Sequence, residues 1–148
     1  KWADIFVENF KGGTTDKMGL AYEDLRKINP RIIYASSGSY GSRGPLRSKA
    51  TMGHISPLFA GWGSISGFPG GPGVVATGGG ISPDPVSPTY LLMDILMALY
   101  YRDARGGEGQ VIDLALYEAV FRLLEFDPIQ YDQLRTIHKR SGNRVSRA

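Results

Sequence analysis

The chain has 148 residues, of which 42% are hydrophobic and 21% are charged, which is the composition of one soluble globular domain. Its formal net charge of +3 is too small to indicate a nucleic-acid-binding protein, and the absence of cysteine excludes disulfides, thiolate catalysis and cysteine-ligated metals. The longest apolar run, residues 90–101, contains Asp94 and is too short to cross a bilayer, so no membrane partner is expected. This composition is compatible with a cytoplasmic protein, and its mild positive charge suits an anionic small molecule that carries phosphates.

Both ends of the chain indicate a piece of a longer protein. The chain begins without methionine and enters an apolar run almost at once. Its last residues, 138–148, are polar and basic and follow neither a helical nor a strand period, so a solvated tail is expected there. We therefore expect a fragment.

Apolar runs and their breaks predict strands that alternate with helices. Residues 5–7 and 31–36 are compact apolar runs, typical of strands buried on both faces of a sheet. A helical period over residues 22–29, ended by Pro30, separates them. This order forms a βαβ unit with parallel strands, and a third strand is expected over residues 111–116. The predicted fold class is α/β with an open parallel sheet and flanking helices.

Four further helices are expected, over residues 55–62, 88–103, 117–124 and 129–137. The helix that begins at Pro88 has the strongest pattern, with Ser87 as its expected N-cap and Pro88 as its first residue. Nearly every face of this helix is apolar, which predicts that it is buried in the core or against a partner subunit.

Asp84 is the strongest candidate for a reactive side chain. Prolines on both sides of it restrict φ, and the glycines at 78–80 allow another group to approach the backbone closely. A short carboxylate on a stiff loop, about one turn before a helix, suits a nucleophile or an acid–base group. An ordinary aspartate in a proline-rich turn is the alternative that the local sequence leaves open.

The loop after the first strand supplies candidates for ligand binding, because ligands of an open parallel sheet gather at the carboxyl ends of its strands. Asn9 could hydrogen-bond a purine or an amide, Phe10 could stack, and Lys17 could pair with a phosphate. A plain loop is the alternative, since the glycine fingerprints of dinucleotide and P-loop sites are absent. His54 opens a predicted helix and suits an acid–base role as well as a structural one. No cluster of His, Asp or Glu has ligand spacing, so no metal site is expected.

Taken in order, these segments resemble the family III CoA-transferases of the CaiB/BaiF type, whose relatives include formyl-CoA, carnitine and bile-acid CoA-transferases. The segments that carry the resemblance are residues 4–10 with 18–20, residues 22–36, residues 38–45, residues 107–119 and residues 142–144. Counting back from the pair Tyr101 and Arg102 places Asp84 at the catalytic aspartate of that family.

The resemblance implies a Rossmann-like fragment of the large CoA-transferase domain, with residues 1–137 in that domain and residues 138–148 as a basic linker towards a second domain. It implies an enzyme that transfers coenzyme A between an acyl-CoA thioester and a carboxylic acid through aspartyl anhydride and aspartyl-CoA intermediates at Asp84. Coenzyme A is then a co-substrate, and no cofactor is bound permanently. The resemblance also implies that Asn9, Phe10 and Lys17 line the CoA site, and that the protein is an interlocked homodimer.

Two alternatives to the transferase are kept. The α-methylacyl-CoA racemases belong to the same superfamily and use a His and an Asp as an acid–base pair, which His54 and Asp84 could supply. Racemases resemble Gly-His-Asp at this point, whereas Ile55 follows His54 here, so the transferase is favoured. In many members a glycine precedes the catalytic aspartate, whereas here Asp84 lies between Pro83 and Pro85. A subunit that binds CoA or a partner without catalysis is the second alternative.

Overall fold

A computed structural model of the chain describes residues 2–50, 53–72 and 82–144. Its strands are β1 (Ile5–Glu8), β2 (Ile33–Ser36) and β3 (Val111–Asp113), and its helices are α1 (Thr14–Met18), α2 (Tyr22–Ile28), α3 (Ile55–Phe59), α4 (Trp62–Ile65), α5 (Pro83–Ala104), α6 (Leu116–Arg122) and α7 (Asp127–Leu134). The glycines at 78–80 lie outside the described residues.

The three strands form one parallel sheet in the order β1-β2-β3, which confirms the α/β class and the parallel pairing predicted from the sequence. Ile5 of β1 pairs with Ile33 of β2, and Tyr34 of β2 pairs with Val111 of β3. All residues of the central strand β2 are buried. The prediction of burial on both faces is wrong for β1, an edge strand of the described sheet in which Val7 is 56% exposed.

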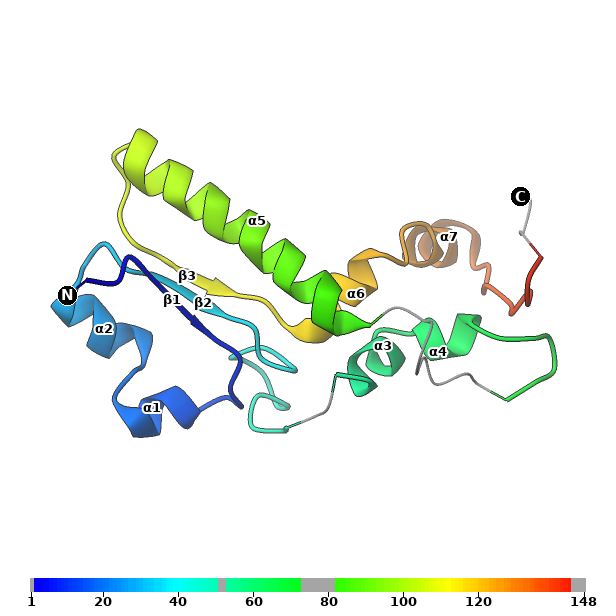
Figure 1. Cartoon of the computed structure of the whole chain (residues 1–148). Coiled ribbons are helices and arrows are strands. Elements are labelled where there is room, and N and C mark those ends of the chain that lie inside the picture. The colour runs from blue at the N-terminus through cyan, green and yellow to red at the C-terminus, as the bar shows by residue number, and fades with distance from the viewer. Residues whose placement is uncertain (1, 51–52, 73–81, 145–148) are drawn as a thin grey trace.

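Helices cover both faces of the sheet (Figure 1). On one face, Ala35 of β2 forms a buried core with Leu91 and Ile95 of α5. On the other face, the ring of Tyr34 packs edge-on against Tyr22 of α2, with 6.1 Å between the ring centroids. Successive strand residues point to opposite faces, so β2 contributes to both layers of packing.

The longest helix, α5, begins at Pro83 and not at Pro88 as the sequence predicted. Ser82 is the N-cap, and its hydroxyl accepts a hydrogen bond from the Asp84 backbone N–H at 3.4 Å. Ser87, the expected cap, is instead fully buried and donates its hydroxyl to a carbonyl at the start of α6 at 3.2 Å. Proline is tolerated at the first helical position because the backbone N–H groups of the first turn have no partner within the helix.

The other predicted helices are present, but they begin or end at residues other than those predicted. The single helix expected over residues 55–62 is divided into α3 and α4 by Gly61, whose φ of 104° lies in the left-handed region. The third strand is shorter than predicted and ends at Asp113. No helix in the described ranges is long and apolar enough to cross a bilayer.

The helices α3, α4 and α7 lie beyond one end of the sheet and give the molecule an elongated shape (Figure 1). The basic C-terminal segment packs against this part and is not a free tail as far as it is described. Arg140 donates hydrogen bonds to the carbonyls of Ser64 and Gly71, and a ring nitrogen of His138 lies 2.9 Å from Asp127 Oδ1. The expectation of a solvated tail therefore does not hold for His138 and Arg140, whereas Lys139, Asn143 and Arg144 are exposed.

Candidate functional site

A cavity of about 510 Å³ opens where the carboxyl ends of β1 and β2 meet the N-terminus of α5. The polar residues that line it are Glu8, Asn9, Ser37, Ser39 and Asp84. Val7, Pro88, Leu91 and Leu116 add apolar surface. The structure thus brings Asn9 and Asp84, which are far apart in the sequence, to one cavity at the edge of the sheet where ligands of α/β folds bind.

Asp84 is held in place by hydrogen bonds that link its helix through α6 to the loop after β2. It is the second residue of α5 and its side chain is exposed. One turn later, the Ser87 hydroxyl donates to the carbonyl of Leu116 at 3.2 Å. The backbone N–H of Leu116 donates in turn to the carbonyl of Gly38, in the loop after β2, at 3.0 Å. The first turns of α5 are therefore fixed against the strand ends.

Gly53 is packed against the Asp84 carboxylate. A Cβ atom at position 53 would lie 2.7 Å from Asp84 Oδ1, closer than a Cβ atom normally approaches any heavy atom. The backbone of Gly53 is not in the left-handed region, so the reason for glycine here is space and not φ. Sequence analysis missed this residue, because a glycine in a loop carries no signal of a contact with a residue so far along the chain.

His54 follows Gly53 but does not share its place at the cavity. It is the N-cap residue of α3, its side chain is exposed, and it is not among the residues that line the cavity. The backbone just before His54 therefore lies against Asp84, but the His54 imidazole does not line the same cavity.

A second cavity, of about 430 Å³, shares Glu8 with the first and contains Phe10. The Glu8 carboxylate accepts a hydrogen bond from the backbone N–H of Phe10 at 2.6 Å, which fixes the turn between the two cavities. Lys17 lies exposed on α1 and lines neither cavity, although Thr15 and Asp16 of the same helix line the second one.

Two cations on the second cavity were missed by sequence analysis. Lys11 and Arg47 both line it. A Cβ atom at Gly12 would lie 2.5 Å from the carbonyl oxygen of Arg47, so the loop after β1 and the loop that carries Arg47 touch backbone to backbone. Arg47 lies in a segment without periodicity, and only this tertiary contact brings its side chain to the site. Cations of this kind suit phosphate groups.

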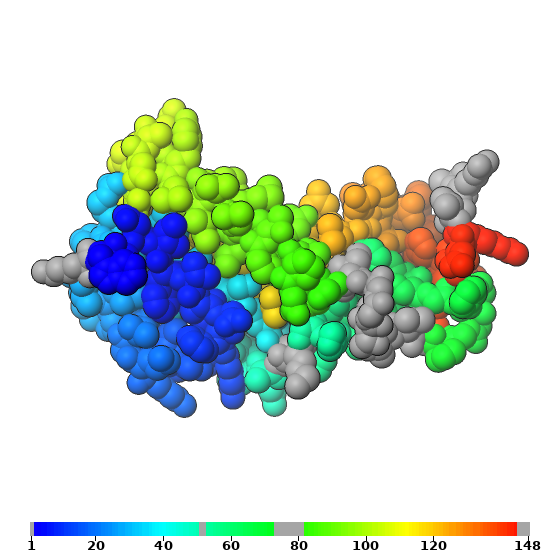
Figure 2. All heavy atoms as spheres, in the orientation of Figure 1, coloured from blue at the N-terminus to red at the C-terminus, as the bar shows by residue number. Residues whose placement is uncertain are grey.

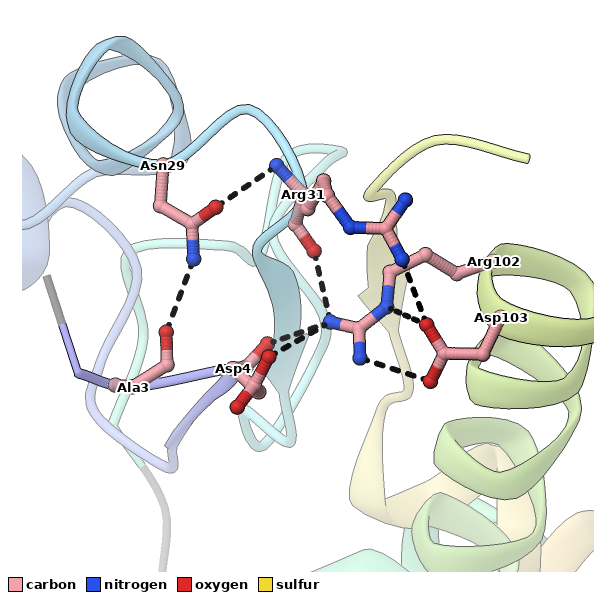
Figure 3. Close-up of polar contacts among 6 residues, drawn as sticks. All are labelled: Ala3, Asp4, Asn29, Arg31, Arg102 and Asp103. Carbon is pink, nitrogen blue, oxygen red and sulfur yellow. Dashed lines mark hydrogen bonds and ion pairs between the residues drawn. The ribbon is translucent and has the colours of Figure 1, made fainter. Parts of the chain in front are cut away.

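The C-terminal end of α5 is anchored by a buried arginine (Figure 3). The side chain of Arg102 is 6% exposed, and its Nε and Nη2 donate to the two carboxylate oxygens of Asp103 at 2.8 and 3.0 Å. Its Nη1 donates to the carbonyl of Arg31, just before β2, at 3.0 Å and to that of Asp4, just before β1, at 3.4 Å. These bonds fix where α5 lies along the sheet, and hence where Asp84 stands at its other end.

The same network shifts the ionisation of both partners. The hydrogen bond with Arg102 lowers the pKa of the Asp103 carboxyl, and the neighbouring positive charges lower it further. The hydrogen bond with Asp103 raises the pKa of Arg102 in spite of its burial. Both shifts favour the charged forms, so the two side chains form an ion pair at neutral pH. Within the described ranges, no group of His, Asp or Glu side chains could hold a metal ion.

The whole chain, residues 1–148, matches the family model described as CoA-transferase family III. It is 38% identical over 141 residues to succinyl-CoA–D-citramalate CoA-transferase of Chloroflexus aurantiacus, a match that covers 95% of this chain and 34% of that protein. It is 35% identical over 142 residues to the alpha subunit of succinyl-CoA–L-malate CoA-transferase of Chloroflexus aurantiacus, covering 95% of this chain and 32% of that protein.

The fold agrees with these matches. A crystal structure of a CaiB/BaiF family protein from Brucella suis superposes with a TM-score of 0.85 at 34% identity, covering 95% of this chain and 36% of the other. The chain thus spans about a third of the length of the relatives it matches. Since the family model covers every residue and the parallel sheet with its flanking helices recurs in a solved member, the chain belongs to CoA-transferase family III.

Proposed function

We propose that the protein containing this chain transfers coenzyme A from an acyl-CoA thioester to a carboxylic acid, with Asp84 as the nucleophile. The observation that carries this proposal is the exposed Asp84 carboxylate at a helix N-terminus, on a cavity that Asn9 also lines. The names of the relatives support it, because both are CoA-transferases.

The proposed reaction begins when an Asp84 oxygen attacks the thioester carbonyl of the donor. The carbon–sulfur bond breaks, leaving a mixed anhydride and CoA thiolate. The thiolate attacks the aspartyl carbonyl, which releases the donor acid and forms a thioester between Asp84 and CoA. The acceptor carboxylate then forms a second anhydride with Asp84, and the released thiolate attacks its acyl carbonyl. The products are the new acyl-CoA and free Asp84, and no ATP is needed because each intermediate keeps an acyl group activated.

Both cavities have a place in this proposal. The Asn9 amide is proposed to hydrogen-bond coenzyme A beside Asp84, and Phe10 is proposed to contact it in the second cavity. Lys11 and Arg47, which line that cavity, are suited to its phosphates. Lys17 is proposed as a further phosphate contact from the nearby helix α1. A carboxylate nucleophile needs no proton removed before it attacks, so no separate general base is required at this step.

Chemical trapping of the intermediates tests the proposal. The complete protein is incubated with an acyl-CoA and then treated with hydroxylamine or borohydride, and its peptides are analysed by mass spectrometry. We expect the modification at Asp84 alone, because only an anhydride or thioester at that carboxyl reacts. An unmodified Asp84 in an enzyme that transfers CoA would contradict the proposed nucleophile.

The racemase alternative has a separate signature. A racemase with His54 and Asp84 as acid and base exchanges the α-proton of the acyl group, so deuterium from solvent enters at Cα without an acceptor acid. The exposed His54 side chain, which does not line the Asp84 cavity, favours the transferase. If the complete protein shows neither deuterium entry nor trapping, the result points to a non-catalytic CoA-binding subunit.

Gly53 provides a test of how closely the Asp84 carboxylate must be placed. We expect Gly53→Ala to lower kcat for CoA transfer about tenfold or more with little change in KM, because the added methyl group displaces the nucleophile. The backbone at this position accepts alanine, so near-UV circular dichroism is expected to remain that of the wild type. An unchanged kcat would show that the Asp84 position seen here is not the reactive one.

The outer face of α5 is proposed to be covered by a partner chain in a homodimer. Figure 2 shows this helix uncovered along its length on the viewed side. Its large apolar residues that are more than half exposed are Leu92, Met93, Leu96, Met97, Tyr100 and Tyr101. An apolar face of this size is unfavourable in water and is typical of an interaction surface. Pairing with a different subunit is the alternative, since one relative is named as an alpha subunit.

A further inference from the structure

The two cavities lie on opposite faces of the sheet and meet at the carboxyl ends of its strands. The second cavity contains Tyr22 of α2, and the Asp84 cavity contains Leu91 of α5, two helices that cover opposite faces (Figure 1). The neighbours Ser36 and Ser37 at the end of β2 line the second cavity and the Asp84 cavity respectively, as the alternation of side chains along a strand requires. A ligand that extends from one cavity into the other therefore passes over the ends of the strands.

Glu8 occupies this crossing point. It is the last residue of β1, and among the described residues it alone lines both cavities. Its backbone carbonyl accepts the N–H of Ser37 at 2.9 Å, and its Oε2 accepts the N–H of Phe10 at 2.6 Å, so both the backbone and the carboxylate are held in position.

The second carboxylate oxygen of Glu8, Oε1, is available to a ligand. It makes no hydrogen bond within the described ranges. The residue is partly exposed, and the side-chain atoms of the described part that are both buried and unpaired are the hydroxyls of Ser37 and Ser56, so Oε1 is not closed off from solvent. The crossing between the cavities thus presents one free acceptor that carries negative charge.

The chemistry of coenzyme A determines which of its groups can meet this acceptor. An ionised carboxylate accepts hydrogen bonds and donates none, so the ligand must offer a donor. In the proposed function the phosphates lie near Lys11 and Arg47 in the second cavity and the thioester lies at Asp84. The pantetheine arm joins these two ends and has to cross Glu8. The ionised phosphates and the thioester carbonyl offer only acceptors, whereas the amide N–H groups of the arm are donors.

We propose that the Glu8 carboxylate accepts a hydrogen bond from an amide N–H of the pantetheine arm and thereby places the thioester at Asp84. The proposal deepens the proposed function and rests on it, because it takes the second cavity as the phosphate site and Asp84 as the reactive group. A hydrogen bond to an ionised acceptor is stronger than one between neutral groups. The same charge repels phosphates, so it also keeps the anionic end of coenzyme A in the second cavity.

Two analogues of CoA test this contact in the complete protein. In each analogue an oxygen replaces one amide N–H of the arm, which gives an ester of nearly the same shape without the donor. Dissociation constants of CoA and of both analogues are measured by calorimetry. We expect the wild type to bind one of the analogues about tenfold or more weakly than CoA, because the Glu8 carboxylate then faces an oxygen in place of a donor.

Glu8→Gln shows whether the carboxylate causes this difference. The glutamine oxygen can still accept the Phe10 N–H, so the turn is kept, but its amide NH₂ then faces the N–H of the arm. We expect this variant to bind CoA about tenfold or more weakly than the wild type, and to bind the affected analogue as tightly as it binds CoA.

Glu118→Gln is the matched control. Glu118 also accepts a backbone N–H, that of Ala115 at 2.9 Å, but it lines neither cavity. We expect this variant to bind CoA and both analogues as the wild type does. The inference is overturned if the wild type binds CoA and both analogues equally, if Glu8→Gln still discriminates against the analogue as the wild type does, or if Glu118→Gln loses as much affinity for CoA as Glu8→Gln. The comparison within the wild type needs no variant, so it decides the matter even if Glu8→Gln does not fold.

Binding of free CoA separates failure of this inference from failure of the proposed function, because it requires no transfer. A discrimination against one analogue that depends on Glu8 supports the inference even if chemical trapping finds no modification at Asp84. Equal binding of CoA and both analogues, or no binding of CoA at all, overturns the inference even in a protein that is an active transferase.

Discussion

Replacing Asp84 by asparagine is expected to lower kcat for CoA transfer by about 10⁴-fold or more while the protein stays folded. The amide is nearly the same size as the carboxylate, so it keeps the contact with Gly53, and the Ser82 cap acts on the backbone of residue 84. The amide oxygen is a far weaker nucleophile and cannot form the anhydride. The lost interaction with the helix dipole is worth only about 0.5 kcal/mol at an exposed position, too little to unfold the protein.

Asp94→Asn is the matched control for this experiment. Asp94 lies in the same helix, and it does not line the Asp84 cavity. Steady-state rates with saturating donor and acceptor are measured for both variants, together with circular dichroism. If Asp84→Asn transfers CoA at a rate near that of the wild type, Asp84 is not the nucleophile. If Asp94→Asn loses as much of the transfer rate as Asp84→Asn does, the effect comes from the helix and not from the cavity.

The parallel sheet could be predicted because its signals are local. Residues 5–7 and 31–36 are dense in β-branched and aromatic side chains, and the helical period between them separates two strands, which makes them parallel. The burial of β1 was overestimated because composition does not reveal which strand lies at an edge. Edge and centre depend on the order of the strands, which only the tertiary structure gives.

The start of α5 illustrates a different limit. Ser82 with Pro83 and Ser87 with Pro88 carry the same N-cap signal, so the sequence offers two starting points for one helix. Which of the two serines caps the helix depends on the hydrogen-bond partner of the Ser87 hydroxyl. Ser87 is fully buried and donates to the Leu116 carbonyl, a partner 29 residues further along the chain. A local pattern cannot indicate such a bond, and the helix therefore includes Asp84 in its first turn.

The candidate site was predictable only in part for the same reason. Asn9 and Asp84 were selected by local features and by family resemblance, and the structure places both on one cavity. Gly53 and Arg47 owe their positions to contacts with segments that are distant in sequence.

Replacing Arg102 by methionine is expected to lower the free energy of unfolding of the complete protein by about 3 kcal/mol, because it removes a buried charged partner. The Asp103 carboxylate keeps Arg31, whose Nη2 lies 2.7 Å from its Oδ1, and is half exposed. The lost stability therefore comes mainly from the two carbonyls ahead of β1 and β2, which lose their hydrogen bonds from Arg102, and from α5, which is no longer fixed along the sheet.

The control for this variant is Arg105→Met, which makes the same chemical change at an exposed residue just beyond the end of α5. Urea denaturation is expected to leave its stability within about 0.5 kcal/mol of the wild type. The Arg102 variant should also lose kcat in its folded fraction, because Asp84 lies roughly 27 Å away along one helix and moves with it. Equal stabilities of the two variants would show that Arg102 does not anchor the helix. If the Arg102 variant is destabilised but fully retains kcat, then the bond from Ser87 to α6 alone places the first turn of α5.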